Sequence, residues 1–242
     1  MFERPHHRRV AEALRALDAD LLDEARCFFG GGTAIVLALG EYRESVDIDL
    51  LCASQEGYRL LRQRVWGVGF EGLTRGPSPV RALRELRADQ YGLRTVLEVG
   101  GVPIKFEVVR EARITLAGAR DPGLGVPVLS REDLYVEKLL ANADRGLNPA
   151  TMGRDVIDLS MMIARWGPVP EPAWAKARGA YGETVDAAWH RAVAAIRDPA
   201  RLDACLRGLS MSPDLAAEVL APHGGPLDPG RTEADRGGTA SG

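Results

Sequence analysis

The sequence has few cysteines, few lysines and no long apolar run. Its three cysteines, Cys27, Cys52 and Cys205, are odd in number and far apart, so they predict neither a disulfide framework nor a CxxC metal or redox site. A membrane-spanning helix needs about 18 or more consecutive apolar residues, and the chain has no such run. The N-terminus lacks the apolar segment of a secretory signal. We therefore expect a cytoplasmic protein that does not enter a membrane.

Lysine is scarce although basic residues are common. Of 31 Lys and Arg residues, only Lys105, Lys138 and Lys176 are lysines, which makes each of them a candidate for a specific role. The net charge of −3 argues against a surface that attracts nucleic acid everywhere, but it leaves a local basic groove open. The four histidines show no zinc-ligand spacing, and the four tryptophans, Trp66 among them, are interpreted as packing residues.

Hydrophobic periodicity predicts an α/β (α+β) protein. Helices are expected at 8–26, 34–39, 55–66, 131–144 and 154–165, and strands at 45–52, 67–71, 91–99 and 102–109. Residues 170–222 predict two or three further helices. We therefore expect a mixed sheet flanked by helices over residues 1–125, a helical part over 126–222, and a disordered tail over 223–242.

Residues 27–50 contain the strongest functional pattern. Gly31 and Gly32 allow the backbone to approach a ligand closely, and the N–H groups of the following helix, with Thr33 as its expected cap, suit a triphosphate. Asp47 and Asp49 are two apart on a predicted strand, so both carboxylates project from one face. Paired carboxylates bind Mg²⁺, which in turn binds phosphate oxygens during nucleotidyl transfer.

Glu107 is the best candidate for a third metal-binding acid. The Gly-Gly pair at 100–101 predicts a two-residue hairpin loop that places Val99 opposite Val102 and Arg94 opposite Glu107. This register leaves two interpretations of Glu107 open. It is either a metal ligand or one half of a cross-strand ion pair with Arg94.

Two later segments supply further polar candidates. Lys138 shares a helix face with Leu134 and Ala141, so its stem could pack while its ammonium group reaches a cleft; the alternative is a solvated surface lysine. Asp155 and Asp158 also share a face. Their alternative role is to stabilise the N-terminus of a helix through its dipole.

Several segments together resemble a known family. Residues 31–34 (GGTA) with 43–50 (RESVDIDL) resemble the first motif of the DNA polymerase β nucleotidyltransferase superfamily, and more narrowly of the AbiEii/AbiGii toxin family, which includes the MenT-type toxins. The segments that resemble the second to fourth motifs are 105–107 (KFE), 137–139 (EKL) with Arg145, and 154–159 (RDVIDL). The resemblance covers residues 25–166.

The resemblance implies a minimal nucleotidyltransferase fold followed by a helical domain that contributes to the nucleotide site. It implies that Gly32 and Thr33 hold the triphosphate of an NTP and that Asp47 and Asp49 bind Mg²⁺. The remaining implied roles fall to basic, hydroxyl and acidic side chains: Lys138 and Asp155 complete the nucleotide site, Arg43 and Ser45 brace the acidic strand or touch the phosphates, and Asp158 is the alternative to Asp155.

The activity expected from this resemblance is Mg²⁺-dependent transfer of a nucleoside monophosphate by a toxin of a toxin–antitoxin or abortive-infection system. The expected acceptor is the 3′ end of tRNA, and the expected partner is a cognate antitoxin. Two alternatives remain open, because a fold does not specify an acceptor. One is transfer to a small molecule such as an aminoglycoside, or to a protein. The other is a non-catalytic protein that binds a nucleotide or a partner.

Overall fold

A mixed β-sheet forms the core of the N-terminal half of the molecule, and the buried apolar side chains of its inner strands hold it there. The computed structural model describes residues 2–224. The strand order is β3-β5-β6-β2-β1-β8-β7, with β4 paired to β5. The strands are Cys27–Phe29 (β1), Ile48–Cys52 (β2), Arg81–Ala82 (β3), Arg87–Ala88 (β4), Gly92–Val99 (β5), Val102–Arg110 (β6), Gly118–Arg120 (β7) and Pro127–Leu129 (β8). The β2–β6 and β1–β8 pairs are parallel, and the other pairs are antiparallel.

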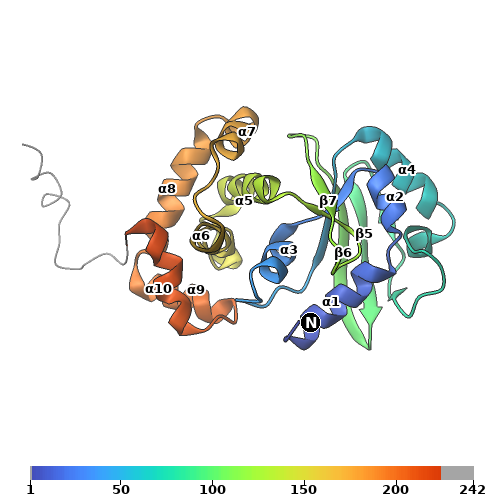
Figure 1. The fold of residues 1–242 in the computed structure, drawn as a ribbon, viewed down its shortest axis with the longest axis horizontal. Helices are drawn as coiled ribbons and strands as arrows, with labels where there is room; N and C mark the ends of the chain where they lie inside the picture. The colour runs from blue at the N-terminus through green and yellow to red at the C-terminus, as the bar shows by residue number, and fades with distance from the viewer. Residues whose placement is uncertain (1, 225–242) are drawn as a thin grey trace, which may run out of the picture.

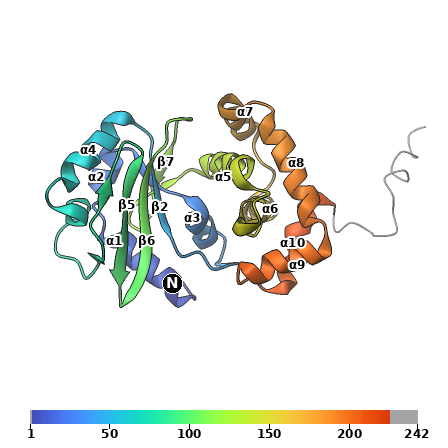
Figure 2. The ribbon, with the colours of Figure 1, turned by 180° about the vertical axis from the view of Figure 1, so that it is seen from behind.

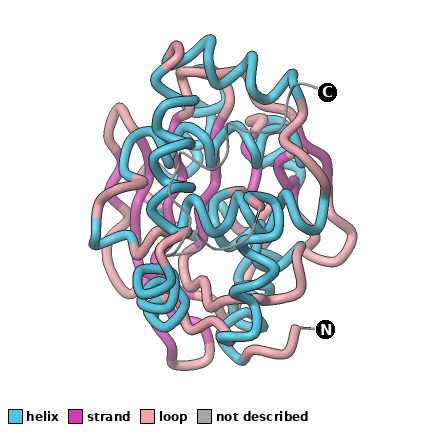
Figure 3. Tube along the Cα trace, turned by 90° about the vertical axis from the view of Figure 1, so that its left-hand side faces the viewer, coloured by secondary structure: helices cyan, strands magenta, loops and turns pink. Residues whose placement is uncertain are grey.

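Helices cover both faces of this sheet (Figure 1). On one side lie Pro5–Ala16 (α1), Ala19–Glu24 (α2) and Gln55–Val65 (α4). On the other side lie Gly31–Ala38 (α3), Arg131–Arg145 (α5), Arg154–Trp166 (α6), Glu171–Tyr181 (α7), Thr184–Ile196 (α8), Pro199–Gly208 (α9) and Ala216–Leu220 (α10). The reverse view shows α3 between the sheet and the helical half (Figure 2). Seen from the helical side, the strands lie behind the helices (Figure 3). The predicted α/β class is confirmed.

The central hairpin forms in the predicted register. Gly100 and Gly101 have φ values of +57° and +78°, as a two-residue turn with left-handed residues at both central positions requires. Val99 pairs with Val102, and Arg94 pairs with Glu107. The sequence therefore placed Glu107 correctly on β6.

Two predicted elements differ in the structure. The helix expected over 8–26 is broken after Ala16, because the Asp18 carboxylate accepts hydrogen bonds from the N–H groups of Asp20 and Leu21 and starts a second helix. The strand expected over 67–71 is wrong. That segment is a 3₁₀ helix, Gly69–Leu73, whose two buried side chains are Phe70 and Leu73. A spacing of three residues places both on one face of a 3₁₀ helix.

The sheet and the helical part also differ from their expected extents. β8 pairs with β1, so the sheet continues beyond residue 125. Residues 170–222 contain four α-helices rather than two or three. The predicted disordered tail falls mostly outside the described residues, although its first residue, His223, ends a short 3₁₀ helix. Within residues 2–224, none of the helices combines the length and apolar character that crossing a membrane requires.

Substitution of Gly57 tests how closely α4 packs against the backbone at Ala25. A Cβ atom at Gly57 would collide with the backbone carbonyl of Ala25, whereas one at Gly179 in α7 would meet nothing within 4 Å. We expect Gly57→Ala to lower the free energy of unfolding by about 1–3 kcal/mol through overpacking. Gly179→Ala, the control, should raise it by about 0.5–1 kcal/mol by removing a flexible residue from a helix. Urea unfolding measures both, and equal effects would contradict the packing.

Candidate active site

A cavity of about 430 Å³ lies where the sheet meets the helical half. The start of α3, the strands β2 and β6, and the helix α5 all contribute to its wall. The predicted site residues that line it are Gly31, Gly32, Thr33, Arg43, Ser45, Asp47, Asp49, Glu107 and Lys138. Of the predicted residues, Asp155 and Asp158 do not line it. One space therefore collects the glycine turn, the acidic strand and the scarce lysine of α5.

The glycine turn fits closely against the acidic strand. The N–H of Gly30 donates to the carbonyl of Asp49 at 2.9 Å, which joins the end of β1 to β2. Gly31 has a φ of +66°, and a Cβ atom there would lie 2.7 Å from Oδ2 of Asp49. Only glycine combines this backbone conformation with space for the carboxylate. The turn therefore holds Asp49 at the edge of the cavity.

Thr33 braces the acidic strand instead of capping α3. The helix begins at Gly31 with Gly30 as its N-cap, so the predicted cap is wrong. The Thr33 hydroxyl instead donates to the carbonyl of Asp47 at 2.6 Å and lies 2.8 Å from the Ser45 hydroxyl. The first-turn N–H groups of a helix have no intrahelical partners and attract anions. At this site they begin at the glycine turn beside the cavity.

The acidic side chains of β2 and β6 gather on one wall of the cavity. Asp49 pairs in parallel register with Glu107, and Asp47 directly precedes β2. Burial raises the pKa of Asp49, and the nearby carboxylates of Asp47 and Glu107 raise it further. Carboxylates that disfavour one another's charge fit a site for a divalent cation. Within residues 2–224, however, no three His, Cys, Asp or Glu side chains already stand in an arrangement able to hold a metal.

The contacts of Glu107 confirm its cross-strand ion pair with Arg94. Its Oε1 accepts a hydrogen bond from Nε of Arg94 at 3.2 Å, which is the cross-strand pair. Its Oε2 accepts one from Nζ of Lys105 at 2.7 Å. The same side chain lines the cavity beside Asp49. Burial lowers the pKa of Lys105, but the bond to Glu107 and the charges of Asp47 and Asp49 raise it more, and the net shift is upward. A metal role for Glu107 stays a prediction.

A buried ion network lies behind the opposite wall. Asp158 has no exposed side-chain surface, and its two oxygens accept hydrogen bonds from Nε and Nη2 of Arg43 at 2.7 and 2.8 Å. The Tyr42 hydroxyl donates to the same carboxylate at 2.5 Å, and Nζ of Lys138 lies 2.6 Å from it. Burial would raise the pKa of Asp158, but the charges of Arg43 and Lys138 hold it below its usual value.

Asp155 extends this network toward α5. It accepts hydrogen bonds from Nζ of Lys138 and Nε of Arg145, both at 2.9 Å. Burial opposes its ionisation, yet Lys138 and Arg145 hold its pKa well below the usual range. Arg43, Lys138 and Arg145 line the cavity, whereas the two carboxylates that bind them lie behind it. The network therefore presents three positive groups to the cavity in fixed positions.

His7 supports the loop that carries Arg43 and Asp47, and the sequence did not reveal this role. Its side chain is fully buried. Nε2 accepts a hydrogen bond from the N–H of Ser45 at 3.2 Å, and Nδ1 lies 2.8 Å from the Glu41 carboxylate. These partners are more than 30 positions away along the chain. Local spacing therefore gave no signal for His7.

Glu137 lines the cavity, although it is not among the site residues predicted from the sequence. It lines the cavity with Glu111 and Arg113, and its Oε2 lies 3.6 Å from Nη2 of Arg113. Its Oε1 is buried, and no residue of the described chain hydrogen-bonds to it. Burial and the neighbouring Glu111 carboxylate raise the pKa of Glu137 to about 8. Glu137 is therefore mostly protonated at neutral pH.

The buried network can be tested through stability. We expect Asp158→Ala to lower the free energy of unfolding by about 3–5 kcal/mol, because the charges of Arg43 and Lys138 would lose a buried partner. Asp203→Ala is the control, since Asp203 is half-exposed and pairs with Arg207 at the surface. Its expected cost is below about 1 kcal/mol. Urea unfolding measures both, and a loss at Asp158 no larger than at Asp203 would contradict the network.

Glu137 predicts a pH dependence of stability. Between about pH 4.5 and pH 8 the folded protein holds a proton on Glu137 that the unfolded chain has released. Stability therefore falls as pH rises through this window, by up to about 1.4 kcal/mol per pH unit. Glu137→Gln removes this contribution. Urea unfolding of both proteins across the window should show the variant gaining stability relative to the wild type as pH rises. Parallel pH profiles would contradict the raised pKa.

Comparison with known proteins identifies the family of the chain. Residues 12–219 match the model of a family described as the nucleotidyl transferase AbiEii toxin of a type IV toxin–antitoxin system. No curated protein matches the chain.

Three solved structures are similar to the chain at low identity. A nucleotidyltransferase from H. pylori has 16% identity and a TM-score of 0.45, with 88% of this chain and 89% of that one covered. JHP933 from Helicobacter pylori has 12% identity and a TM-score of 0.37, with 87% and 100% covered. An antigenic nucleotidyltransferase-like protein from Paracoccidioides brasiliensis has 16% identity and a TM-score of 0.35, with 91% and 94% covered. Because the family model matches most of its length, the chain belongs to the AbiEii nucleotidyltransferase toxin family.

Proposed function

We propose that this nucleotidyltransferase moves a nucleoside monophosphate from an NTP to an RNA acceptor, with the 3′ end of tRNA as the first candidate. The observation that carries the proposal is the cavity itself, which has carboxylates on its β2–β6 wall and fixed positive groups on its α5 wall. In an NTP bound to a divalent cation, the cation matches the carboxylates and the triphosphate matches the positive groups. The family's toxin–antitoxin pairing supports a cognate antitoxin as the physiological partner.

The α3 turn and the basic wall would bind the triphosphate. The N–H groups after Gly31 provide an anion site at a helix N-terminus, and Lys138 and Arg145 line the same cavity. The carboxylates of Asp155 and Asp158 would act as positioning groups, because each accepts hydrogen bonds from basic side chains that line the cavity. Fixed charges of this kind stabilise a phosphoryl transition state without reorganising during the reaction.

Asp47 and Asp49 are the residues proposed to hold Mg²⁺. Their oxygen ligands suit a hard cation, and the raised pKa of Asp49 indicates negative charge that a cation would offset. Bound Mg²⁺ supplies charge stabilisation for the attacking and leaving oxygens. Glu107 would join this site only after releasing Arg94 or Lys105, because both carboxylate oxygens are bound to them. The helix face of Lys138, by contrast, already points at the cavity.

The charges of the cavity bear on the choice between an RNA and a small-molecule acceptor. A cationic small molecule is the second candidate, because Glu111, Glu137 and Asp144 all line one side of the cavity. Arg113 lies 2.5 Å from the Glu111 carboxylate and 3.5 Å from that of Asp144, and it offsets part of this acidic charge. Arg113 therefore leaves the cavity with less negative charge to bind a cationic acceptor than the number of its acidic residues indicates. For this reason we prefer RNA to a cationic small molecule as the acceptor.

Asp47→Ala tests the catalytic assignment. We expect nucleotide transfer to fall on the order of 100-fold or more, because metal binding supplies several kcal/mol of transition-state stabilisation. The free energy of unfolding should change little. Glu85→Gln is the control, since Glu85 is exposed and does not line the cavity. The measurement is incorporation of label from each of the four α-labelled NTPs, with Mg²⁺, into total tRNA and, separately, into an aminoglycoside.

The two acceptor classes give different results in this assay. Labelled tRNA with wild-type protein and none with Asp47→Ala supports the proposal. Labelled aminoglycoside together with unlabelled tRNA would contradict RNA as the acceptor and support a cationic small molecule instead. Full activity of Asp47→Ala would remove Asp47 from the site.

A further inference from the structure

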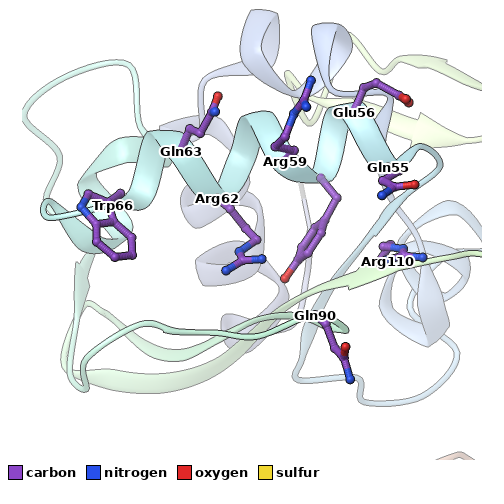
Figure 4. A pocket seen from close by; sticks show the side chains of 9 residues that line it. Gln55, Glu56, Arg59, Arg62, Gln63, Trp66, Gln90 and Arg110 are labelled. Atoms are coloured by element: carbon purple, nitrogen blue, oxygen red, sulfur yellow. The ribbon is translucent and has the colours of Figure 1, made fainter.

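A second cavity lies on the other side of the sheet, against α4. Its volume is about 480 Å³, and we call it the α4 cavity. Figure 4 shows its side chains along α4, with Gln90 in the loop before β5 and Arg110 at the end of β6. The residues that matter for its chemistry are Arg59, Arg62, Gln63, Trp66, Gln90 and Arg110. None of these residues lines the cavity beside Asp47 and Asp49, which we call the catalytic cavity because of its proposed role.

The arginines of the α4 cavity lack bound partners. Over residues 2–224, the side chains of Arg59, Arg62 and Arg110 form no hydrogen bond or ion pair. Many other arginines of the chain are paired, as Arg43 and Arg178 are. One acid, Glu56, lines the α4 cavity. The cavity therefore carries a net positive charge although the whole chain carries −3.

Trp66 adds an exposed aromatic ring. Its exposed fraction is 84%, so its interpretation as a packing residue is wrong. Trp66 directly follows the last residue of α4. Figure 4 shows Arg62 and Trp66 on the side of the helix toward Gln90, whereas Arg59 points to the other side of the helix. An open indole beside guanidinium groups suits the stacking of a base next to its phosphate. The amides of Gln63 and Gln90 can donate and accept hydrogen bonds to base edges.

The end of β6 connects the two cavities. Arg110 lines the α4 cavity, and the next residue, Glu111, lines the catalytic cavity. Successive side chains of a strand point to opposite faces, so one strand end borders both spaces. Arg110 follows Glu107 by three residues, which is about 10 Å along a strand. A nucleic acid with its end in the catalytic cavity could therefore reach the α4 cavity by passing around the end of β6.

We propose that the α4 cavity binds a single-stranded segment of the RNA acceptor. Arg59, Arg62 and Arg110 bind its phosphates, and a base stacks on Trp66. This proposal rests on the proposed function, because it extends the acceptor site of the same reaction. RNA is favoured over an acidic protein because a peptide carboxylate would use the arginines but would leave the exposed indole without a stacking partner.

Binding of RNA in the absence of NTP tests the α4 cavity separately from catalysis. The probe is a fluorescently labelled single-stranded RNA of about 15 nucleotides, and the measurement is anisotropy of the full chain across a salt series. We expect Arg59→Gln with Arg62→Gln to weaken binding and to reduce the slope of log K against log salt by about 0.7 per lost phosphate contact. Trp66→Ala should weaken binding about tenfold through lost stacking, with the salt slope retained.

Arg64→Gln is the matched control. Arg64 is also an exposed arginine of α4, but it does not line the α4 cavity. We expect its affinity and salt slope to equal those of the wild type. Undetectable RNA binding by the wild type would overturn the proposal. So would an effect of Arg64→Gln equal to that of Arg59→Gln combined with Arg62→Gln. Binding of a polyglutamate peptide in place of RNA would also overturn it and assign the cavity to an acidic protein.

The same variants distinguish failure of this proposal from failure of the proposed function. Loss of RNA binding in the Arg59 and Arg62 variants, without nucleotide transfer by the wild type, would support the α4 cavity and contradict the function. Transfer to RNA with an unchanged KM for RNA in those variants would contradict the α4 cavity alone.

Discussion

The buried contact of Lys138 with two carboxylates is the interaction on which the catalytic cavity depends. Nζ of Lys138 lies 2.9 Å from Asp155 and 2.6 Å from Asp158, and Arg43 binds Asp158 from the loop before β2. This network joins the sheet half, α5 and α6 at one point. Charges buried in this way are costly unless each has a partner. The ion pairs among these buried charges therefore fix the position of α5 relative to the acidic strand. They also fix the shape of the cavity between the two.

The cavity is consequently polarised. Asp49 and Glu107 belong to the sheet and Asp47 directly precedes it, whereas Lys138 and Arg145 belong to α5, which also contributes Glu137 and Asp144. A cation suits the first wall and a polyphosphate suits the second, so a metal–NTP complex has the charges to bridge them. The α/β half and the helical half of the chain both contribute side chains to the wall of this cavity.

Local patterns predicted the parts of this site that depend on neighbouring residues. The Gly-Gly turn gave the register that places Glu107 on β6, since a two-residue loop fixes strand pairing. The contact of Arg43 with Asp158 spans 115 positions and the contact of His7 with Ser45 spans 38, and no local period encodes such distances. Trp66 was assigned to packing from its residue type, but the helix face that carries it is left open by the surrounding elements.

A crystal structure of the protein with Mn²⁺ and a non-hydrolysable NTP analogue tests most directly whether the cavity between the sheet and α5 binds a metal–NTP complex. We expect an anomalous difference peak at the carboxylates of Asp47 and Asp49, with the triphosphate between the first turn of α3 and the ammonium group of Lys138. Nucleotide bound outside this cavity, or Mn²⁺ bound away from both carboxylates, would contradict this expectation.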